Sequence, residues 1–312
     1  MGTAIEMRDF KPLPAKLEIG DKVRFVSPAS PPEREGVYQR ARLLESWGLR
    51  VDFGRHVFDK LGYLAGSDED RLADFNGALR DPGIRAIFAT RGGKGSYRIA
   101  DRLDFTAARN DPKHVVGFSD ITILHLALLK NSGLPGIHGT FMNSGEGVIE
   151  EQSIESLRQA VMTAENVPVH SRAEEATSVL TTGGIAEGRL IGGNLEMIST
   201  AAGWALPELS GAILLVEAVN MHIGQLDRQL TMLRKSGCLR GLAGIALGQF
   251  TGFRTDGDFT MIDLLRDHLG RLDVPVLGGL PLGHGEQPLS IPTGTMAALD
   301  ANSGTLTALR EQ

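Results

Sequence analysis

The chain has 312 residues, 42% of them hydrophobic, and a formal net charge of −6 at pH 7. This length is enough for about two domains with substantial cores, and the negative charge argues against nucleic acid or an anionic membrane as a main partner. Cys238 is the single cysteine, so no intrachain disulfide can form. The first residues lack the pattern of a secretory signal, and no apolar run approaches the length of a membrane span. The sequence therefore predicts a cytoplasmic protein without a membrane segment.

The first half of the chain alternates strand and helix patterns with short connections. In chain order we expect a strand over 22–26, a helix over 32–47, a strand over 49–53, a helix capped by Ser67, a strand over 84–90, a helix near 97–103, a strand over 114–118, a helix over 122–130 and a strand from Gly136. Such alternation implies a mostly parallel sheet covered by helices on both faces.

The second half follows a polar stretch over 163–182 that has no clear periodicity. We place the domain boundary there, with an N-terminal domain over 1–165, a linker over 166–182 and a C-terminal domain over 183–312. In the C-terminal domain we expect a strand over 212–216, a helix around 223–233, a strand over 242–250, a helix over 261–269 and a hairpin over 296–309.

Three reactive side chains stand where apolar, strand-like runs give way to turns: Ser119, Glu217 and His284. Ser119 closes the run 114–118 and precedes a helical pattern, so we expect it on a tight strand-to-helix turn. Glu217 follows the run 212–216, which is apolar enough to be a buried strand, so its carboxylate should emerge at the carboxyl end of that strand. His284 follows a third run of this kind.

Taken singly, each of these residues has a more ordinary structural interpretation. Ser119 can be the N-cap of the helix that follows, Glu217 can pair with a nearby Arg or Lys, and His284 can be a surface group in a Gly/Pro loop. The combination favours chemistry, because a serine is inert until a base takes its proton, and the base needs a third group to orient it. In open α/β sheets, ligands bind beyond the carboxyl ends of strands, where all three are expected.

Four segments resemble those of the LD-carboxypeptidase family of serine peptidases, and the matching blocks run in order from about Val23 to 292–294. The segments are Arg91-Gly92-Gly93, Gly117-Phe118-Ser119-Asp120-Ile121-Thr122, Gly188-Arg189-Leu190-Ile191-Gly192-Gly193-Asn194-Leu195 and Gly283-His284-Gly285. The resemblance implies a flavodoxin-like α/β N-terminal domain with a mostly parallel sheet. It also implies a C-terminal domain of mixed, barrel-like β structure, and a homodimer.

The resemblance also implies roles for individual residues. Ser119 would be the nucleophile, His284 the general base and acid, and Glu217 the group that orients the histidine. The oxyanion hole would come from the backbone N–H groups of Gly93 and Asp120, which stabilise charge that develops only in the transition state. The nucleophile then lies in the first domain and its partners in the second, so the site is completed only across the domain interface. Neither a cofactor nor a metal is implied.

The substrate that the resemblance implies is a murein tetrapeptide, from which the enzyme would remove the terminal D-alanine during cell-wall recycling. A second branch of the family, resembling the microcin self-immunity peptidases, cleaves aminoacyl-nucleotide amides by the same chemistry. The family often has tyrosine after the double glycine, whereas this chain has Lys94, close to the expected substrate cleft. A two-domain binding protein that holds a small ligand without chemistry is an alternative of a different class, since fold alone does not establish catalysis.

Other motifs fail when they are tested on the sequence. A phosphate-binding P-loop ending at Lys94 would need glycine at Phe88 and Ser or Thr at Gly95, and a dinucleotide fingerprint from Gly93 would need glycine at Arg98. No His-Glu-x-x-His pattern is present. The Gly-x-Ser-x-Gly elbow of α/β-hydrolases is half met, because Ile121 occupies its second glycine position. A nucleotide-binding enzyme and a metallopeptidase are therefore disfavoured.

Overall fold

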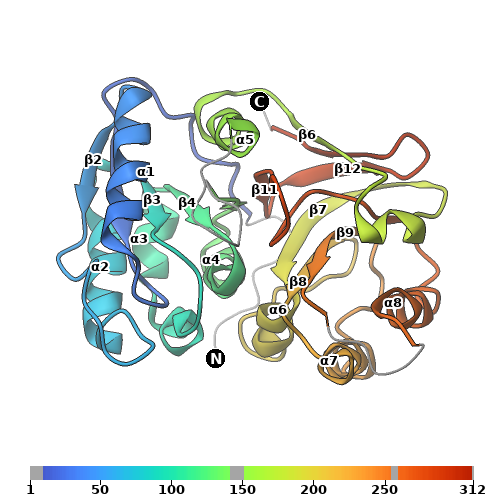
Figure 1. Ribbon diagram of the computed structural model, residues 1–312. Helices are drawn as coiled ribbons and strands as arrows, with labels where there is room; N and C mark the ends of the chain where they lie inside the picture. The colour runs from blue at the N-terminus through green and yellow to red at the C-terminus, as the bar shows by residue number, and fades with distance from the viewer. Residues whose placement is uncertain (1–9, 141–150, 254–258, 311–312) are drawn as a thin grey trace.

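The computed structural model describes residues 10–140, 151–253 and 259–310 (Figure 1). Two β-sheets lie side by side, each with its own helices, and helices of the two halves meet between them (Figure 1). The first sheet has six strands and the second has seven.

The first sheet has the strand order β11-β5-β4-β3-β1-β2. Its strands are β1 (Lys22–Val26), β2 (Arg50–Phe53), β3 (Ile84–Ala89), β4 (His114–Gly117), β5 (Gly136–His138) and β11 (Ile291–Thr293). All neighbouring pairs are parallel except β11 with β5, which is antiparallel. The order 2-1-3-4-5 of the parallel strands is that of flavodoxin-like folds, so the expected N-terminal fold is confirmed.

Among the described residues, five α-helices cover both faces of this sheet: α1 (Arg34–Ser46), α2 (Asp68–Arg80), α3 (Phe105–Asn110), α4 (Thr122–Ser132) and α5 (Glu151–Met162). Side chains of α2, α3 and α4 form one core with the sheet, and those of α1 and α5 form another on the opposite face. Within β4, Val115 belongs to the first core and Val116 to the second. This period of two explains why the strand is apolar throughout.

The second sheet has the order β10-β9-β8-β7-β12-β13-β6. Its strands are β6 (Val167–His170), β7 (Ile185–Asn194), β8 (Ile213–Val219), β9 (Gly244–Thr251), β10 (Val276–Leu277), β12 (Met296–Asp300) and β13 (Thr305–Ala308). The pairs from β10 to β7 are parallel, and those from β7 to β6 are antiparallel. The predicted mixed sheet and its β12–β13 hairpin are thus confirmed.

The second sheet curls around its own core (Figure 1). Ile213 and Leu215 of β8 point into this inner core, while Leu214 and Val216 join a core formed with the helices outside. Those helices are α6 (Leu195–Ala201), α7 (Ile223–Lys235) and α8 (Met261–Leu269). The outer core also contains side chains of α4, so it runs without interruption from one half of the molecule to the other.

Several sequence predictions need correction. The helix expected near 97–103 is instead two short 3-10 helices, Ser96–Arg98 and Ala100–Arg102. The run before His284 forms only the two-residue strand β10, and the rest of it is irregular. The polar stretch expected to lack regular structure contains β6, which pairs with β13, and a 3-10 helix over Ala176–Leu180.

One strand from the second half of the chain belongs to the first sheet. Strand β11 comes from the range that we assigned to the C-terminal domain, yet it pairs with β5 of the first sheet. The domain boundaries themselves stay a prediction. Within the described ranges, every helix is too short or too polar to cross a lipid bilayer.

Candidate active site

Ser119 lies on the tight turn between β4 and α4, as the sequence predicted. It begins a 3-10 helix, Ser119–Ile121, that leads directly into α4. Its φ of 62° is in the left-handed region, where residues other than glycine are uncommon. Backbone strain of this kind costs on the order of 1–3 kcal/mol and persists where the surrounding structure enforces it, often at active sites. The turn presents Ser119 at the carboxyl edge of the first sheet.

The turn that follows β3 packs against Ser119. A Cβ atom added to Gly92 would lie 2.7 Å from the Cβ of Ser119, closer than real side chains approach. Gly93 has a φ of 112°, a conformation that other residues rarely adopt. The two glycines therefore allow the backbone of this turn to lie directly beside the serine, and Gly93 and Asp120 flank Ser119 on two adjoining turns.

Glu217 lies in β8, where its side chain is completely buried. The strand does not end at this residue, as the sequence suggested, but continues to Val219. The pairing of β8 with β9 shifts register between Val216 and Ala218, on either side of Glu217. Irregularities of this kind turn a side chain out of the regular pattern and are frequent near active sites.

His284 is hydrogen-bonded to Glu217, with 2.7 Å between Nδ1 of the histidine and Oε2 of the carboxylate. The His284 side chain is 10% exposed. Its loop is fastened to β9, because the Thr251 hydroxyl donates to the His284 carbonyl oxygen (2.9 Å) and the backbone N–H of Gly285 donates to the Gln249 side chain (2.7 Å). Hydrogen bonds thus hold both the imidazole ring of His284 and the backbone of its loop.

Asn194 completes the surroundings of the carboxylate. Its Nδ2 donates to Oε1 of Glu217 (3.1 Å), so each carboxylate oxygen accepts a hydrogen bond. Its backbone N–H donates to Oγ1 of Thr122 (3.1 Å), on the first turn of the helix that follows Ser119. Hydrogen bonds therefore connect the helix that follows Ser119 with the Glu217–His284 pair.

Phe118 and His138 place the first half of the chain against His284. The Phe118 ring lies 4.7 Å from the His284 ring and 6.2 Å from the His138 ring, centroid to centroid. Neither ring nitrogen of the buried His138 has a hydrogen-bond partner among the described residues. Burial lowers the pKa of His138 to about 4, so this imidazole is neutral at physiological pH. Since Phe118 directly precedes Ser119, its contact brings the serine turn and the histidine together.

The cationic side chains near these turns differ in their surroundings. Arg189 stacks over the Phe10 ring at 4.4 Å and donates to the Gly294 carbonyl oxygen (2.8 Å), which is a structural role. Arg91 and Lys94 are exposed on the turn after β3. These two cations are therefore accessible to an anionic ligand.

One group within the described ranges could bring three metal-ligand atoms together. It consists of His56, Asp59 and Asp70, in the region between β2 and the first turn of α2. His56 Nδ1 lies 2.8 Å from Asp59, and Asp59 holds the pKa of His56 above its usual range. The contacts of His56 with the two carboxylates, at 2.8 Å to Asp59 and 3.7 Å to Asp70, account for this arrangement, and none of the predicted site residues belongs to it.

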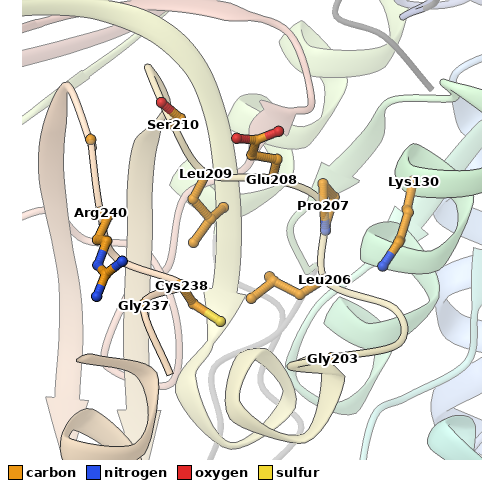
Figure 2. Close-up of a pocket in the computed structure, with 11 residues that line it drawn as sticks. Lys130, Gly203, Leu206, Pro207, Glu208, Leu209, Ser210, Gly237, Cys238 and Arg240 are labelled. Atoms are coloured by element: carbon orange, nitrogen blue, oxygen red, sulfur yellow. The ribbon is translucent and has the colours of Figure 1, made fainter. Parts of the chain in front are cut away.

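A cavity of about 480 Å³ lies at the amino ends of strands β8 and β9, beside α4 (Figure 2). Figure 2 shows Lys130 of α4 together with the loops that carry Leu206 and Arg240. These loops precede β8 and β9, whereas Glu217 lies toward the carboxyl end of β8. The cavity therefore contains none of the predicted site residues.

Sequence reasoning missed the supporting residues of this site. Asn194 stood within a family-like segment but was given no role, and Gln249 lay near the end of the apolar run 242–250 and was also given none. The signal for both is a polar side chain at the carboxyl end of a buried strand, the same signal that identified Glu217. Phe118 carried no such signal, because its contact with His284 depends on how the two halves pack.

This arrangement defines a two-part α/β protein in which a strained serine turn packs, through Phe118, against a histidine that is hydrogen-bonded to a buried carboxylate. Serine, histidine and a carboxylate are the residue types of a serine hydrolase. The LD-carboxypeptidase N-terminal domain matches residues 23–139, and the LD-carboxypeptidase C-terminal domain matches residues 187–299. The chain belongs to the LD-carboxypeptidase family, as its motifs indicated. It is a serine-type carboxypeptidase, a hydrolase that acts on peptide bonds.

Individual relatives cover nearly the whole chain. A putative carboxypeptidase of Streptomyces coelicolor is 36% identical over 306 residues, covering 94% of this chain and 95% of the relative. The murein tetrapeptide carboxypeptidase of Pseudomonas aeruginosa is 32% identical over 292 residues, covering 91% and 94%.

Solved structures share the fold. Muramoyltetrapeptide carboxypeptidase from Oxalobacter formigenes superposes with a TM-score of 0.80 at 27% identity, covering 92% of this chain and 97% of that one. The microcin self-immunity protein MccF superposes with a TM-score of 0.85 at 24% identity, covering 97% and 99%. At that identity, the likeness to MccF concerns the fold alone.

Proposed function

We propose that this protein is an LD-carboxypeptidase that removes the terminal D-alanine of a murein tetrapeptide, using Ser119, His284 and Glu217 as its catalytic triad. The observation that carries the proposal is the buried Glu217–His284 hydrogen bond, with Phe118 joining that pair to the serine turn. Relatives named as murein tetrapeptide carboxypeptidases support the substrate.

The geometry suggests how the proton moves. Nδ1 of His284 is engaged by Glu217, so Nε2 is the nitrogen that accepts the Ser119 proton as Oγ attacks the carbonyl carbon of the L,D-amide bond. The resulting imidazolium is stabilised by the Glu217 carboxylate and protonates the nitrogen of the departing D-alanine. Water then attacks the acyl-enzyme with His284 acting as base again, which releases the tripeptide and restores Ser119.

The tetrahedral intermediate needs donors for its oxyanion. The backbone N–H groups of Gly93 and Asp120 are proposed for this role, because they lie on the two turns that meet at Ser119. A single such donor is typically worth about two to three orders of magnitude in rate. Arg91 and Lys94, exposed on the turn after β3, are the cations available to a substrate carboxylate.

The test is release of D-alanine from purified murein tetrapeptide by the native protein and by Ser119→Ala, Glu217→Gln and His284→Ala. Release that collapses in the serine and histidine variants, while their thermal unfolding is unchanged, supports both the reaction and the triad. Undiminished release by Ser119→Ala would contradict the proposal.

Aminoacyl-nucleotide amides form the second arm of the same test. A structure of MccF contains aspartyl sulfamoyl adenosine, and the shared fold makes this class of substrate the alternative. Cleavage of such a compound without release of D-alanine would replace murein by an aminoacyl nucleotide and leave the triad in place. The homodimer and the cytoplasmic location remain predictions from the sequence and its resemblance.

A further inference from the structure

The carboxylate of Asp120 is buried directly behind the serine turn. Only 2% of this residue is exposed, and its Oδ2 accepts the backbone N–H of Ser96 at 2.8 Å. Ser96 ends the glycine-rich segment after β3, which also contains Gly92 and Gly93. The Asp120 side chain therefore connects the turn that carries the nucleophile with the turn that lies against it.

The turn after β3 is held from its other sides as well. Ser30 donates its backbone N–H to the Gly92 carbonyl oxygen (3.4 Å), and its hydroxyl accepts the Lys94 N–H (3.1 Å). Arg71 donates from Nη1 to the Gly95 carbonyl oxygen (2.9 Å). These contacts attach the turn to the segment that follows β1 and to α2, whereas the Asp120 contact attaches it to the turn that carries Ser119.

The buried position of the Asp120 carboxyl is electrostatically unfavourable. Its Oδ1 has no hydrogen-bond partner among the described residues, and burial raises the pKa of its carboxyl to about 6. Against this effect of burial, Ser96 lowers the pKa of Asp120 by hydrogen bonding; Glu196 raises it and Arg71 lowers it. If only the backbone N–H of residue 120 were needed, an apolar side chain would serve and would avoid the free-energy cost of burying a carboxylate.

We propose that Asp120 is the positioning residue of the oxyanion hole. Its own backbone N–H supplies one donor, and its carboxylate, through the Ser96 N–H, holds the turn whose Gly93 N–H supplies the other. Donors act only when they lie within about 2.7–3.1 Å of the position that the oxyanion occupies. One side chain thus fixes the separation of both donors. This inference rests on the proposed function, because it takes Ser119 as the nucleophile.

The test uses a fluorophosphonate, which measures serine reactivity without any assumption about the natural substrate. Ser119 Oγ attacks phosphorus, fluoride leaves, His284 accepts the serine proton, and the phosphoryl oxygen uses the oxyanion hole. The second-order rate of labelling at Ser119, read by mass spectrometry of the peptide, is compared among the native protein, Asp120→Ala and Asp120→Asn. Asparagine retains an oxygen that can accept the Ser96 N–H, whereas alanine does not.

We expect Asp120→Ala to slow labelling at least tenfold and Asp120→Asn to stay within about fivefold of the native rate. Asp74→Ala is the matched control, because Asp74 is also a buried aspartate that accepts a backbone N–H, that of His56 at 2.7 Å, away from Ser119. The control should lower the melting temperature and leave the labelling rate unchanged. If Asp120→Ala is too unstable to purify, Asp120→Ser replaces it, because its hydroxyl is one bond too short to reach Ser96.

The outcomes separate this inference from the function on which it rests. Equal labelling rates for native protein and Asp120→Ala would overturn the positioning role alone. Equal slowing by Asp74→Ala would also overturn it, since the effect would then be one of stability. Failure of the native protein to label at Ser119, or labelling that persists in His284→Ala, would contradict the proposed function itself.

Discussion

The ring of Phe118 packs on the ring of His284 across the two halves of the molecule, with 4.7 Å between centroids and 40° between planes. A residue adjacent to the proposed nucleophile, Ser119, therefore supports the proposed base. Aromatic pairs of this kind are worth about 0.5–1.5 kcal/mol beyond the area that they bury. The contact makes the position of His284 depend on the packing of the first half against the second.

We expect Phe118→Ala to lower kcat by about fivefold, because the base would be less well oriented. This corresponds to a rise of about 1 kcal/mol in the activation free energy. KM should change little, because Phe118 is expected to act through His284. The measurement is steady-state D-alanine release, with Phe53→Ala as the control. Phe53 stacks on Phe25 at 6.0 Å in β2, at the far edge of the first sheet, so its loss should reduce stability alone. An unchanged kcat in Phe118→Ala would contradict the expectation.

Glu217→Gln tests whether the carboxylate orients and stabilises the histidine. Because Glu217 is fully buried and bonded to His284 at 2.7 Å, an amide there removes the negative charge that stabilises the imidazolium. We expect kcat to fall by about 10⁴-fold, the loss seen when the acid of a serine triad becomes an amide. Because Asn194 can still contact the new side chain, the melting temperature should change far less than kcat does. Activity within tenfold of native would show that Glu217 does not serve the base.

Gly92→Ala tests the close approach of the turn after β3. The added Cβ would lie 2.7 Å from the Cβ of Ser119 and 3.2 Å from the Phe118 carbonyl oxygen, so the two turns must separate. We expect kcat to fall by at least tenfold, because displaced oxyanion donors lose most of their effect. Gly77→Ala is the control, since a Cβ at that site in α2 meets nothing within 4 Å and should stabilise the helix by roughly 0.5–1 kcal/mol. A native kcat in Gly92→Ala would mean that the oxyanion donors do not lie on the turn after β3.

The sequence allowed much of the fold to be predicted, because its local signals agree with the packing. Helix α2 begins after Ser67, whose side chain accepts the Asp70 N–H, and α8 spans the residues that the pattern indicated. The failures arose where tertiary contacts override local pattern. Strand β6 was missed because Val167 and Val169 are apolar positions in an otherwise polar stretch, and only pairing with β13 makes them core.

The site shows the same division between local and long-range information. Ser119 and Glu217 were found from apolar runs that end in a reactive residue. The register shift at Glu217 could not be foreseen, because it arises in the pairing of β8 with β9. The hydrogen bonds that Asn194 makes to Glu217 and Thr122 join segments far apart in the chain, so no local pattern reports them.

Buried histidines should make the protein sensitive to acid. Burial lowers the pKa from 6.5 to about 4 for His114 and His138 and to about 3 for His125. The unfolded chain therefore binds protons that the folded chain does not, so stability is complete above pH 6.5 and is lost as the pH falls toward 4. Each group contributes about 3 kcal/mol or more to that loss, at 1.36 kcal/mol per pKa unit.

Urea unfolding at pH 7.5, 6 and 5 measures this loss. We expect the free energy of unfolding to decrease steadily over the series, and His125→Gln to reduce the slope, because glutamine does not titrate. His170 is exposed in β6, so His170→Gln serves as the control and should leave the slope unchanged. A free energy of unfolding that stays constant from pH 7.5 to 5 would contradict the prediction.

Asp120 should affect stability with the opposite sign. Burial raises the pKa of its carboxyl from 3.8 to about 6, so between these values the folded protein binds a proton that the unfolded chain has released. Stability from this group is therefore lost as the pH rises from about 4 to 6, by about 3 kcal/mol in total. Asp120→Asn removes this ionisation. Relative to the native protein, the variant should gain about 2.5 kcal/mol between pH 4 and pH 8, measured by urea unfolding at both values. A difference between the two proteins that is the same at both pH values would mean that Asp120 ionises normally in the folded state.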